Sequence, residues 1–264
     1  MILLSGWLGD SSSAYILGTG DYLYRKGYSV FRLNYRDHGD SHHLNEEPFY
    51  ATFLNEVFEC VSQAASIERS VPVFLAGFSL GGNFALRIAR KCATNDVANL
   101  THIISISPVL DPDKTTDAVD RDIIIRTYFL RKWRKSLLKK QSLFPEKYDF
   151  HSILNNSKLR TVTEELIKRY SPYESARRYF QAYEIKDDAL TTVSVPTTII
   201  TAEDDPIIPI GDFHRLELNH LTKLVIHRHG GHNGFIENWR LNTWYERKMV
   251  SLFDEIVGSK PWFP

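Results

Sequence analysis

The chain has 264 residues, which is enough for one large α/β domain with an insertion. Lysine plus arginine and aspartate plus glutamate both number 32, so a zero net charge gives no global field that would recruit nucleic acid. We therefore expect no nucleic-acid partner, and no apolar run approaches the ~20 residues that a membrane-spanning helix needs.

The two cysteines, Cys60 and Cys92, lie in segments with helical patterns and have neither CxxC nor metal-ligand spacing. We expect both to be buried free thiols in a reducing compartment. The residues after Met1 are apolar but lack a basic lead-in and a small-residue cleavage site, so they do not form a typical signal peptide. A cytoplasmic location is the resulting prediction.

Short apolar segments alternate with longer amphipathic ones, which is typical of β-α units around a mostly parallel sheet. Six segments are rich in valine, isoleucine and leucine without strict alternation, as expected for strands covered on both faces. They comprise residues 2–5, 29–35, 71–76, 103–107, 197–201 and 223–227. The sequence therefore predicts an α/β fold with a mostly parallel sheet flanked by helices.

Two helices are predicted from apolar residues that recur about every four positions, which places them on one helix face. The first set is Phe49, Phe53, Val57 and Val61. The second set, near the C-terminus, is Leu241, Tyr245, Met249, Leu252 and Ile256. We expect both stripes to face the core.

Residues 108–195 contain no convincing buried strand, only helical patterns and loops rich in basic and aromatic residues. Because a structureless connection of this length is uncommon, we expect a mostly helical insertion at about residues 111–192 of a domain that spans residues 1–264. Ligands bind at the carboxyl ends of the strands of a parallel sheet, which is where this insertion would lie. The insertion is therefore predicted to be a lid.

A tight strand-to-helix turn follows the third predicted strand, with the sequence Gly77-Phe78-Ser79-Leu80-Gly81. Side chains at positions 77 and 81 would collide with neighbouring strands, and glycine removes them. The strained turn presents the Ser79 hydroxyl at a helix N-terminus. The five residues alone could arise by chance, but the strand before them and the helix after them favour Ser79 as a catalytic nucleophile.

A serine nucleophile needs a base, and the loop after the last predicted strand holds the best-placed histidine. In the sequence Gly230-Gly231-His232-Asn233-Gly234, the glycines let the loop reach over the sheet edge and bring His232 to Ser79. We expect His227 and His229 to be structural instead.

The acid of the site should follow the preceding strand, where Glu203, Asp204 and Asp205 are consecutive. Asp205 is preferred because the following Pro-Ile-Ile-Pro forms a turn that carries the chain away after it. Asp204 is the second choice. Asp111, after the strand at residues 103–107, is the third.

An oxyanion hole requires two backbone donors. The first is the amide after the nucleophile, which belongs to Leu80. The second usually lies in the loop after the first strand here, in the sequence Ser5-Gly6-Trp7-Leu8-Gly9. The Trp7 amide is the candidate, and the Leu8 amide is the alternative.

Three stretches carry a family resemblance: residues 31–45 (Phe-Arg-Leu-Asn-Tyr-Arg-Asp-His-Gly-Asp-Ser-His-His-Leu-Asn), residues 77–83 and residues 230–235. On these motifs the chain resembles the YheT-like family of α/β-hydrolases, which is related to the abhydrolase domain-containing proteins 1, 2 and 3. The resemblance implies an α/β-hydrolase fold and a catalytic triad of Ser79, Asp205 and His232. It runs through essentially the whole chain and is weakest in the insertion.

The chain departs from the family pattern in two places. Ser5-Gly6 replaces the usual His-Gly, a change that keeps the backbone amides. Family members also carry tens of residues before this point that form the first two strands. By comparison with that pattern, we expect the sheet here to lack these two strands, which would leave the strand at residues 29–35 as an exposed edge.

The roles of Asp37, His38, His42 and His43 stay open between two interpretations. A hydrogen-bonded loop that braces the site is favoured, and metal binding is the alternative. The predicted chemistry itself needs no metal and no organic cofactor.

A serine nucleophile at this strand-to-helix turn predicts acyl transfer through an acyl-enzyme, with a small-molecule or lipid carboxylic ester as substrate. The expected activity is that of a carboxylesterase or a lipase-like enzyme. The alternatives are an alcohol acyltransferase and a catalytically silent hydrolase-fold binding protein. The oligomeric state is left open.

One predicted helix of the insertion carries Ile125, Phe129, Trp133 and Leu137 at four-residue spacing. Much of its remaining surface is basic, with Arg131, Lys132, Arg134, Lys135, Lys139 and Lys140. The favoured interpretation is a lid helix that packs its apolar stripe on the domain and solvates its charges. The alternative is peripheral membrane contact through this helix, with the basic residues on an anionic surface.

Overall fold

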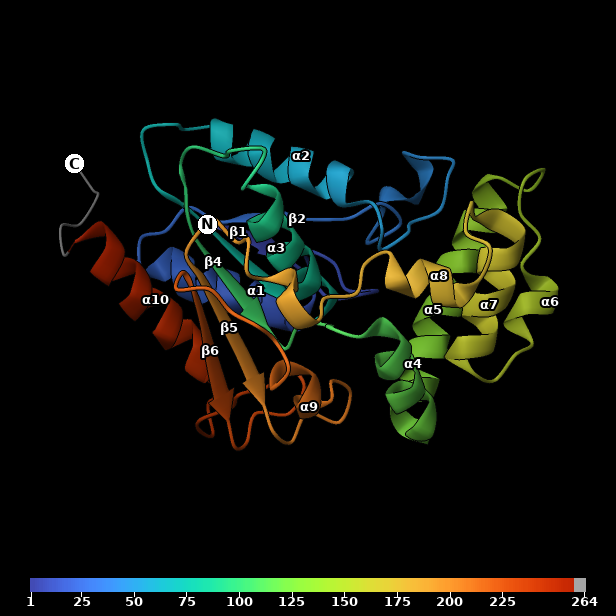
Figure 1. Ribbon diagram of the computed structural model, residues 1–264. Helices are drawn as coiled ribbons and strands as arrows, with labels where there is room; N and C mark the ends of the chain where they lie inside the picture. The colour runs from blue at the N-terminus through green and yellow to red at the C-terminus, as the bar shows by residue number, and fades with distance from the viewer. Residues whose placement is uncertain (259–264) are drawn as a thin grey trace.

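The computed structural model describes residues 1–258, in which six strands form one sheet (Figure 1). The strands are β1 (Ile2–Leu4), β2 (Phe31–Leu33), β3 (Val73–Phe78), β4 (Leu100–Ile106), β5 (Thr197–Ala202) and β6 (Thr222–His227). Their order in the sheet is β2-β1-β3-β4-β5-β6, and every neighbouring pair is parallel. The predicted parallel α/β fold is confirmed, with strand ends that differ from the prediction by a few residues.

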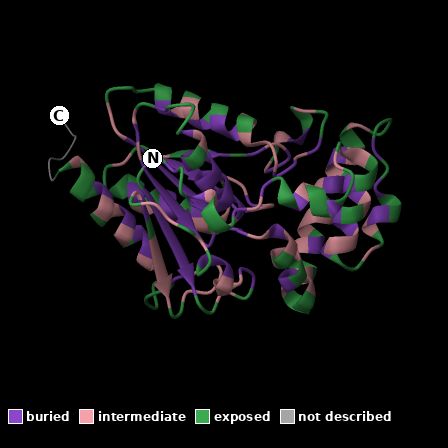
Figure 2. Cartoon of the chain, in the orientation of Figure 1, coloured by how far each residue is buried: buried purple, intermediate pink, exposed green. Residues whose placement is uncertain are grey.

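Helices cover both faces of the sheet, which explains why its strands lack a polar side (Figure 2). Within β1, Leu3 packs in the cluster formed with α1 (Ala14–Arg25) and α10 (Trp244–Val257). Ile2 and Leu4 belong to the opposite cluster, formed with α2 (Leu54–Ser66) and α3 (Leu80–Lys91). Successive side chains of a strand point to opposite faces, so each strand serves both clusters.

Strand β2 is the edge of this sheet, as the sequence predicted. Phe31 is 43% exposed and Arg32 is exposed, whereas Leu33 is buried. The open side of β2 therefore offers unpaired backbone groups along a short, partly charged strand.

The predicted helix over residues 49–61 begins later than expected, at Leu54. Phe49 lies in the preceding loop, where its backbone N–H donates to the Asp37 carboxylate at 2.9 Å, and Phe53 is the residue before the helix. The Phe49 amide is thus hydrogen-bonded to the side chain of Asp37 and not to a backbone carbonyl of a helix. Further along, Val57 and Val61 face the core as predicted.

Two expectations about burial are wrong. Cys60 is exposed, because it precedes Val61 by one position and points away from the buried stripe, whereas Cys92 is buried. In α10 the buried face is Tyr245, Met249 and Phe253, while Leu241 precedes the helix and is exposed, Leu252 is partly buried and Ile256 is 39% exposed. The apolar spacing identified the helix but misplaced part of its buried face.

The segment between β4 and β5 is helical and lies to one side of the sheet (Figure 1). It contains α4 (Pro112–Arg121), α5 (Ile123–Leu143), α6 (His151–Leu154), α7 (Leu159–Tyr170) and α8 (Ala176–Gln181). In residues 1–258, no helix combines the length and the apolarity required to cross a membrane.

Helix α5 packs its apolar stripe inward, as favoured by the sequence. Ile125, Phe129 and Trp133 are partly buried against the core, and Leu137 is buried. The basic residues are not all on the surface, however. Arg131 and Lys135 are exposed, whereas the Lys140 side chain is only 1% exposed.

Lys140 forms a buried ion pair that joins α5 to the loop after β2. Its Nζ donates to Asp37 Oδ1 at 2.8 Å, to the Asn45 carbonyl at 2.5 Å and to the His42 carbonyl at 3.3 Å. The second oxygen of Asp37 accepts the Phe49 amide at 2.9 Å. Both charges are therefore compensated by hydrogen bonds, which a buried ion pair requires.

Substitution Lys140→Met should destabilise the protein by about 3–5 kcal/mol, because it leaves the Asp37 carboxylate buried without its partner. The measurement is the free energy of unfolding from a denaturant titration. Adding Asp37→Asn should recover part of the loss. Lys147→Met is the control, since Lys147 and Glu46 form an exposed pair whose loss should cost about 0–1 kcal/mol. Equal losses in the two single variants would contradict the prediction.

Candidate active site

The backbone at Ser79 is strained in the way that the sequence predicted. Ser79 stands between the end of β3 and the start of α3 with φ 54° and ψ −113°. A Cβ on Gly77 would lie 2.0 Å from the Gly81 carbonyl oxygen, and one on Gly81 would lie 2.4 Å from the Leu4 carbonyl oxygen. The turn is therefore compatible with glycine alone at these two positions.

The structure brings the three predicted polar residues together. His232 Nε2 lies 3.0 Å from Ser79 Oγ, and His232 Nδ1 lies 2.8 Å from Asp205 Oδ2. The other carboxylate oxygen of Asp205 accepts the amides of Ile207 and Ile208 at 2.8 and 3.0 Å. The Asp205 side chain is fully buried and that of His232 is 15% exposed, so the pair is shielded while the imidazole still reaches the site.

The alternative acids make other contacts. Asp204 Oδ1 accepts the amides of Gly230 and Gly231, each at 2.8 Å, and these hydrogen bonds lower the pKa of Asp204. Asp204 thus anchors the loop that carries His232, a role that sequence reasoning missed although the acid run and the glycine loop were both noted. Asp111 caps α4 by accepting the Lys114 amide at 3.1 Å.

The other histidines near the last strand do not reach Ser79. The His229 side chain is 77% exposed and lies 3.5 Å from Asp204. The His227 ring packs against Trp244 with 4.0 Å between centroids, and partial burial lowers its pKa. Neither ring is hydrogen-bonded to Ser79, whose imidazole partner is His232.

The loop after β1 leaves one amide free for an oxyanion. The Gly6 amide donates to the Tyr15 hydroxyl at 2.8 Å, and the Leu8 amide donates to His38 Nε2 at 3.1 Å. In residues 1–258, the Trp7 and Leu80 amides donate to no other group. Trp7 and Leu80 therefore remain the two candidate donors, and the alternative at Leu8 is occupied.

His38 is a buried part of the brace that the motif at residues 31–45 forms. Only 3% of His38 is exposed, and burial lowers its pKa to about 4. The neutral ring donates from Nδ1 to the Arg36 carbonyl at 2.8 Å and accepts the Leu8 amide at Nε2. On the other side of Leu8, the Lys132 Nζ donates to the Leu8 carbonyl at 3.1 Å. Both polar groups of Leu8 are thus held in place.

The remaining histidines of the motif make no metal-binding cluster within the described part of the chain. His42 Nε2 lies 2.8 Å from the Ser136 hydroxyl on α5, and His43 is exposed. The hydrogen bonds of Asp37, His38 and His42 agree with the interpretation of these three residues as a brace, whereas the exposed His43 side chain makes no such bond in residues 1–258.

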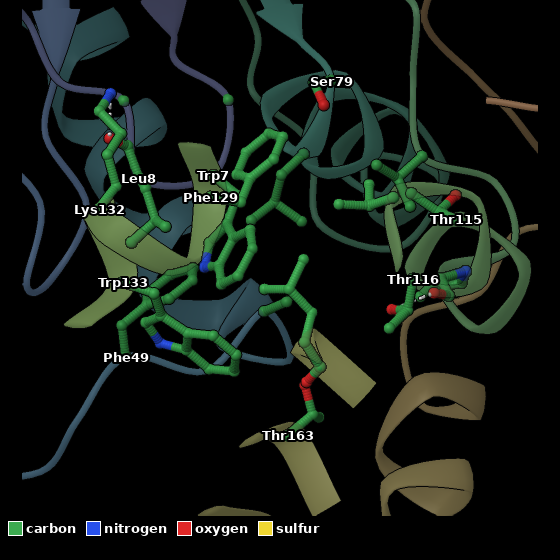
Figure 3. Close-up of a pocket in the computed structure, with 18 of the residues that line it drawn as sticks. Trp7, Leu8, Phe49, Ser79, Thr115, Thr116, Phe129, Lys132, Trp133 and Thr163 are labelled. Carbon is green, nitrogen blue, oxygen red and sulfur yellow. Dashed lines mark hydrogen bonds between the residues drawn. The ribbon is translucent and has the colours of Figure 1, made fainter. Parts of the chain in front are cut away.

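A cavity of about 520 Å³ opens beside Ser79 and His232 and extends among the helices between β4 and β5 (Figure 3). The indole of Trp7 stacks on Phe129 at 5.6 Å and meets Trp133 edge-on at 4.8 Å, so aromatic rings line the wall near Ser79. Most other lining residues are apolar or aromatic, among them Phe49, Val109, Val119, Leu137, Leu166, Ile167, Tyr170, Phe180 and Ile207. The cavity suits an apolar group.

The parallel sheet and the strained serine between a strand and a helix define this protein as an α/β-hydrolase by fold. The family comparison is more specific. Residues 1–237 match the family model described as serine aminopeptidase, S33, and the chain belongs to this family. No curated protein matches the chain by sequence.

Solved structures share the fold at low sequence identity. An esterase of Pyrococcus furiosus is 15% identical with a TM-score of 0.56, over 96% of this chain and 81% of that one. A serine hydrolase of Cycloclasticus zankles is 15% identical with a TM-score of 0.61, over 97% and 90%. Mouse α/β-hydrolase domain-containing protein 10 is 13% identical with a TM-score of 0.52, over 98% and 89%.

Substitution Gly81→Ala should destabilise the protein by roughly 3 kcal/mol or more, because the new methyl group would overlap the β1 backbone. Gly18→Ala is the control: Gly18 lies in α1 and is exposed, and a Cβ there would meet only the Glu246 carboxylate at 3.8 Å. Thermal unfolding of both variants tests the contrast. Gly18→Ala should be neutral or slightly stabilising, and a similar loss in both would contradict the packing argument.

Proposed function

We propose that the chain is a serine hydrolase of carboxylic esters, with carboxylesterase or lipase-like activity. The observation that carries the proposal is the position of one imidazole. His232 lies 3.0 Å from the Ser79 hydroxyl and 2.8 Å from the Asp205 carboxylate. A hydroxyl, an imidazole and a carboxylate in this order form a proton path for nucleophilic catalysis, and this path ends at the wall of an apolar cavity.

In the proposed first step, the Ser79 oxygen attacks the ester carbonyl carbon while His232 Nε2 takes the hydroxyl proton. Asp205 stabilises the imidazolium through Nδ1. The carbonyl oxygen becomes an oxyanion, for which the amides of Leu80 and Trp7 are the donors. The bond to the alcohol then breaks, the alcohol leaves with the proton from His232, and the acyl group stays on Ser79.

The second step repeats this sequence with water as the nucleophile. His232 takes a proton from water, the acyl-enzyme ester bond breaks, and the Ser79 oxygen recovers its proton from His232. An alcohol in place of water would make the protein an acyltransferase, the alternative that uses the same residues. No residue role in either version requires a metal or an organic cofactor.

The cavity supports an ester rather than the peptide substrate suggested by the family description. A carboxylate is the acceptor that binds the ammonium group of a peptide N-terminus most strongly. Among the described residues that line the cavity, Asp37 carries the one carboxylate, and it is paired with Lys140 at 2.8 Å. A free partner for an ammonium group is therefore missing from this part of the chain.

Within the S33 family we propose the YheT-like branch, on the motif at residues 31–45. We also propose that α4–α8 act as the lid, since α4, α5, α7 and α8 all contribute to the cavity wall. Peripheral membrane contact through α5 stays a prediction. Of the basic residues at positions 131–140, Arg131 and Lys135 are exposed, Lys132, Arg134 and Lys139 are partly buried, and Lys140 is buried.

A fluorophosphonate probe tests the nucleophile directly. Wild-type protein should form a covalent adduct on Ser79 at neutral pH, and Ser79→Ala should form none. Asp205→Asn should keep the fold but lower kcat for ester hydrolysis by about 10⁴-fold, because the amide favours the wrong imidazole tautomer and carries no charge to stabilise the imidazolium. A panel of 4-nitrophenyl esters of increasing acyl length measures kcat. If the folded wild-type protein forms no adduct, the result would contradict the proposal and support the alternative of a catalytically silent hydrolase-fold binding protein.

Because His38 holds the Leu8 amide, we expect it to affect kcat without contacting the substrate. His38→Leu should lower kcat by about 10- to 100-fold with little change in KM, because the Leu8 peptide loses its acceptor and the neighbouring oxyanion donor shifts. His38→Gln should recover much of the loss, since a side-chain amide can both accept from Leu8 and donate to Arg36. Wild-type kcat in a folded His38→Leu variant would show that the brace is dispensable.

A further inference from the structure

The wall of the cavity carries one basic side chain without an acidic partner. Among the described residues that line the cavity, Lys132 is the one lysine or arginine. It is half-buried, and no carboxylate in residues 1–258 lies within 4.0 Å of its ammonium group. Its contacts are the Leu8 carbonyl at 3.1 Å and the face of the Tyr128 ring at 5.2 Å from the centroid.

Other basic residues of α5 are engaged elsewhere or point away. Lys139 pairs with Asp40 at 2.8 Å, and Lys140 pairs with Asp37 at 2.8 Å. Arg134 donates to the Asn156 carbonyl at 2.8 Å. Arg131 and Lys135 are exposed and do not line the cavity. Lys132 therefore differs from them because it lines the cavity and its ammonium group has no carboxylate partner among the described residues.

The position of Lys132 relates it to the loop that carries one proposed oxyanion donor. Its ammonium group contacts Leu8, which directly follows the residue whose amide is the proposed oxyanion donor, Trp7. Figure 3 shows Lys132 next to Leu8, at the end of the aromatic wall that also carries Trp7, Phe129 and Trp133. An ammonium group has three donors, and the Leu8 carbonyl uses one of them. The other two are available to an acceptor inside the cavity.

We infer that Lys132 is a specificity residue that binds an anionic group, a carboxylate or a phosphate, which the ester substrate carries on the part that lies against the cavity wall beside the Leu8 peptide. This inference rests on the proposed ester hydrolysis at Ser79. A charge-assisted hydrogen bond from a half-buried ammonium group is stronger than a neutral one, and it would offset the cost of holding a cation in an apolar wall. The preferred substrate is thus an ester with an apolar part and one negative charge.

Matched ester pairs test the inference, each with one neutral and one anionic member. On the acyl side the pair is 4-nitrophenyl hexanoate and the 4-nitrophenyl half-ester of adipic acid. On the alcohol side one pair is the hexanoates of 4-hydroxybenzamide and 4-hydroxybenzoate, and another is 1-hexanoylglycerol and its 3-phosphate. The three pairs distinguish a charge on the acyl group, a carboxylate on the alcohol and a phosphate on the alcohol.

The readout is the ratio of kcat/KM for the anionic member to that for the neutral member. In at least one pair, Lys132→Met should lower this ratio about tenfold, and Lys132→Glu should lower it further. Lys132→Arg should retain the ratio in part. Lys135→Met, at an exposed site on the same helix, should leave it at the wild-type value.

The ratio separates recognition from support of the loop. If Lys132 serves only to hold the Leu8 carbonyl, Lys132→Met lowers kcat for both members equally and the ratio stays at the wild-type value in all three pairs. That result would overturn the inference while leaving ester hydrolysis intact. Failure of the wild-type protein to hydrolyse any member would count instead against the proposed function.

Discussion

The close approach of three backbone segments at Ser79 is the constraint on which the rest of the site depends. The carbonyl of Leu4 on β1, the turn at Gly77 and the first residues of α3 meet with no side chain between them. The register that pairs Leu4 with Gly77 in the sheet sets this approach. The φ of 54° at Ser79 is unfavourable for a residue other than glycine, so the surrounding sheet and helix must impose this backbone conformation.

The helices between β4 and β5 are coupled to this centre by specific polar contacts as well as by apolar packing. The buried Asn83 of α3 donates to the carbonyls of Val109, which precedes α4, and Tyr183, which follows α8. Lys140 joins α5 to Asp37, and Lys132 joins it to Leu8. A movement of α5 would therefore act both on the cavity wall and on the loop that carries the proposed oxyanion donor.

The brace explains why a polar motif follows an edge strand. Asp37 receives the Lys140 ammonium and the Phe49 amide, while its neighbour His38 receives the Leu8 amide. Burial keeps His38 neutral near neutral pH, since its pKa falls to about 4, and only the neutral ring can accept at Nε2. The Asp37 carboxylate thus binds the helical insertion through Lys140, and the neutral His38 ring binds the loop beside Ser79 through the Leu8 amide.

The sequence by itself determined the strands, their parallel arrangement and the position of Ser79, because apolar periodicity and a glycine-flanked turn are properties of short segments. It also predicted Asp205 and His232, since chain order limits which loops meet Ser79 at one sheet edge. Only the tertiary structure decided that Asp204 anchors the histidine loop, that the Leu8 amide is occupied and that Lys140 is buried while Lys132 lines the cavity. These outcomes depend on contacts between residues 26 to 124 positions apart. Spacing along the chain does not encode which of several similar side chains makes such a contact.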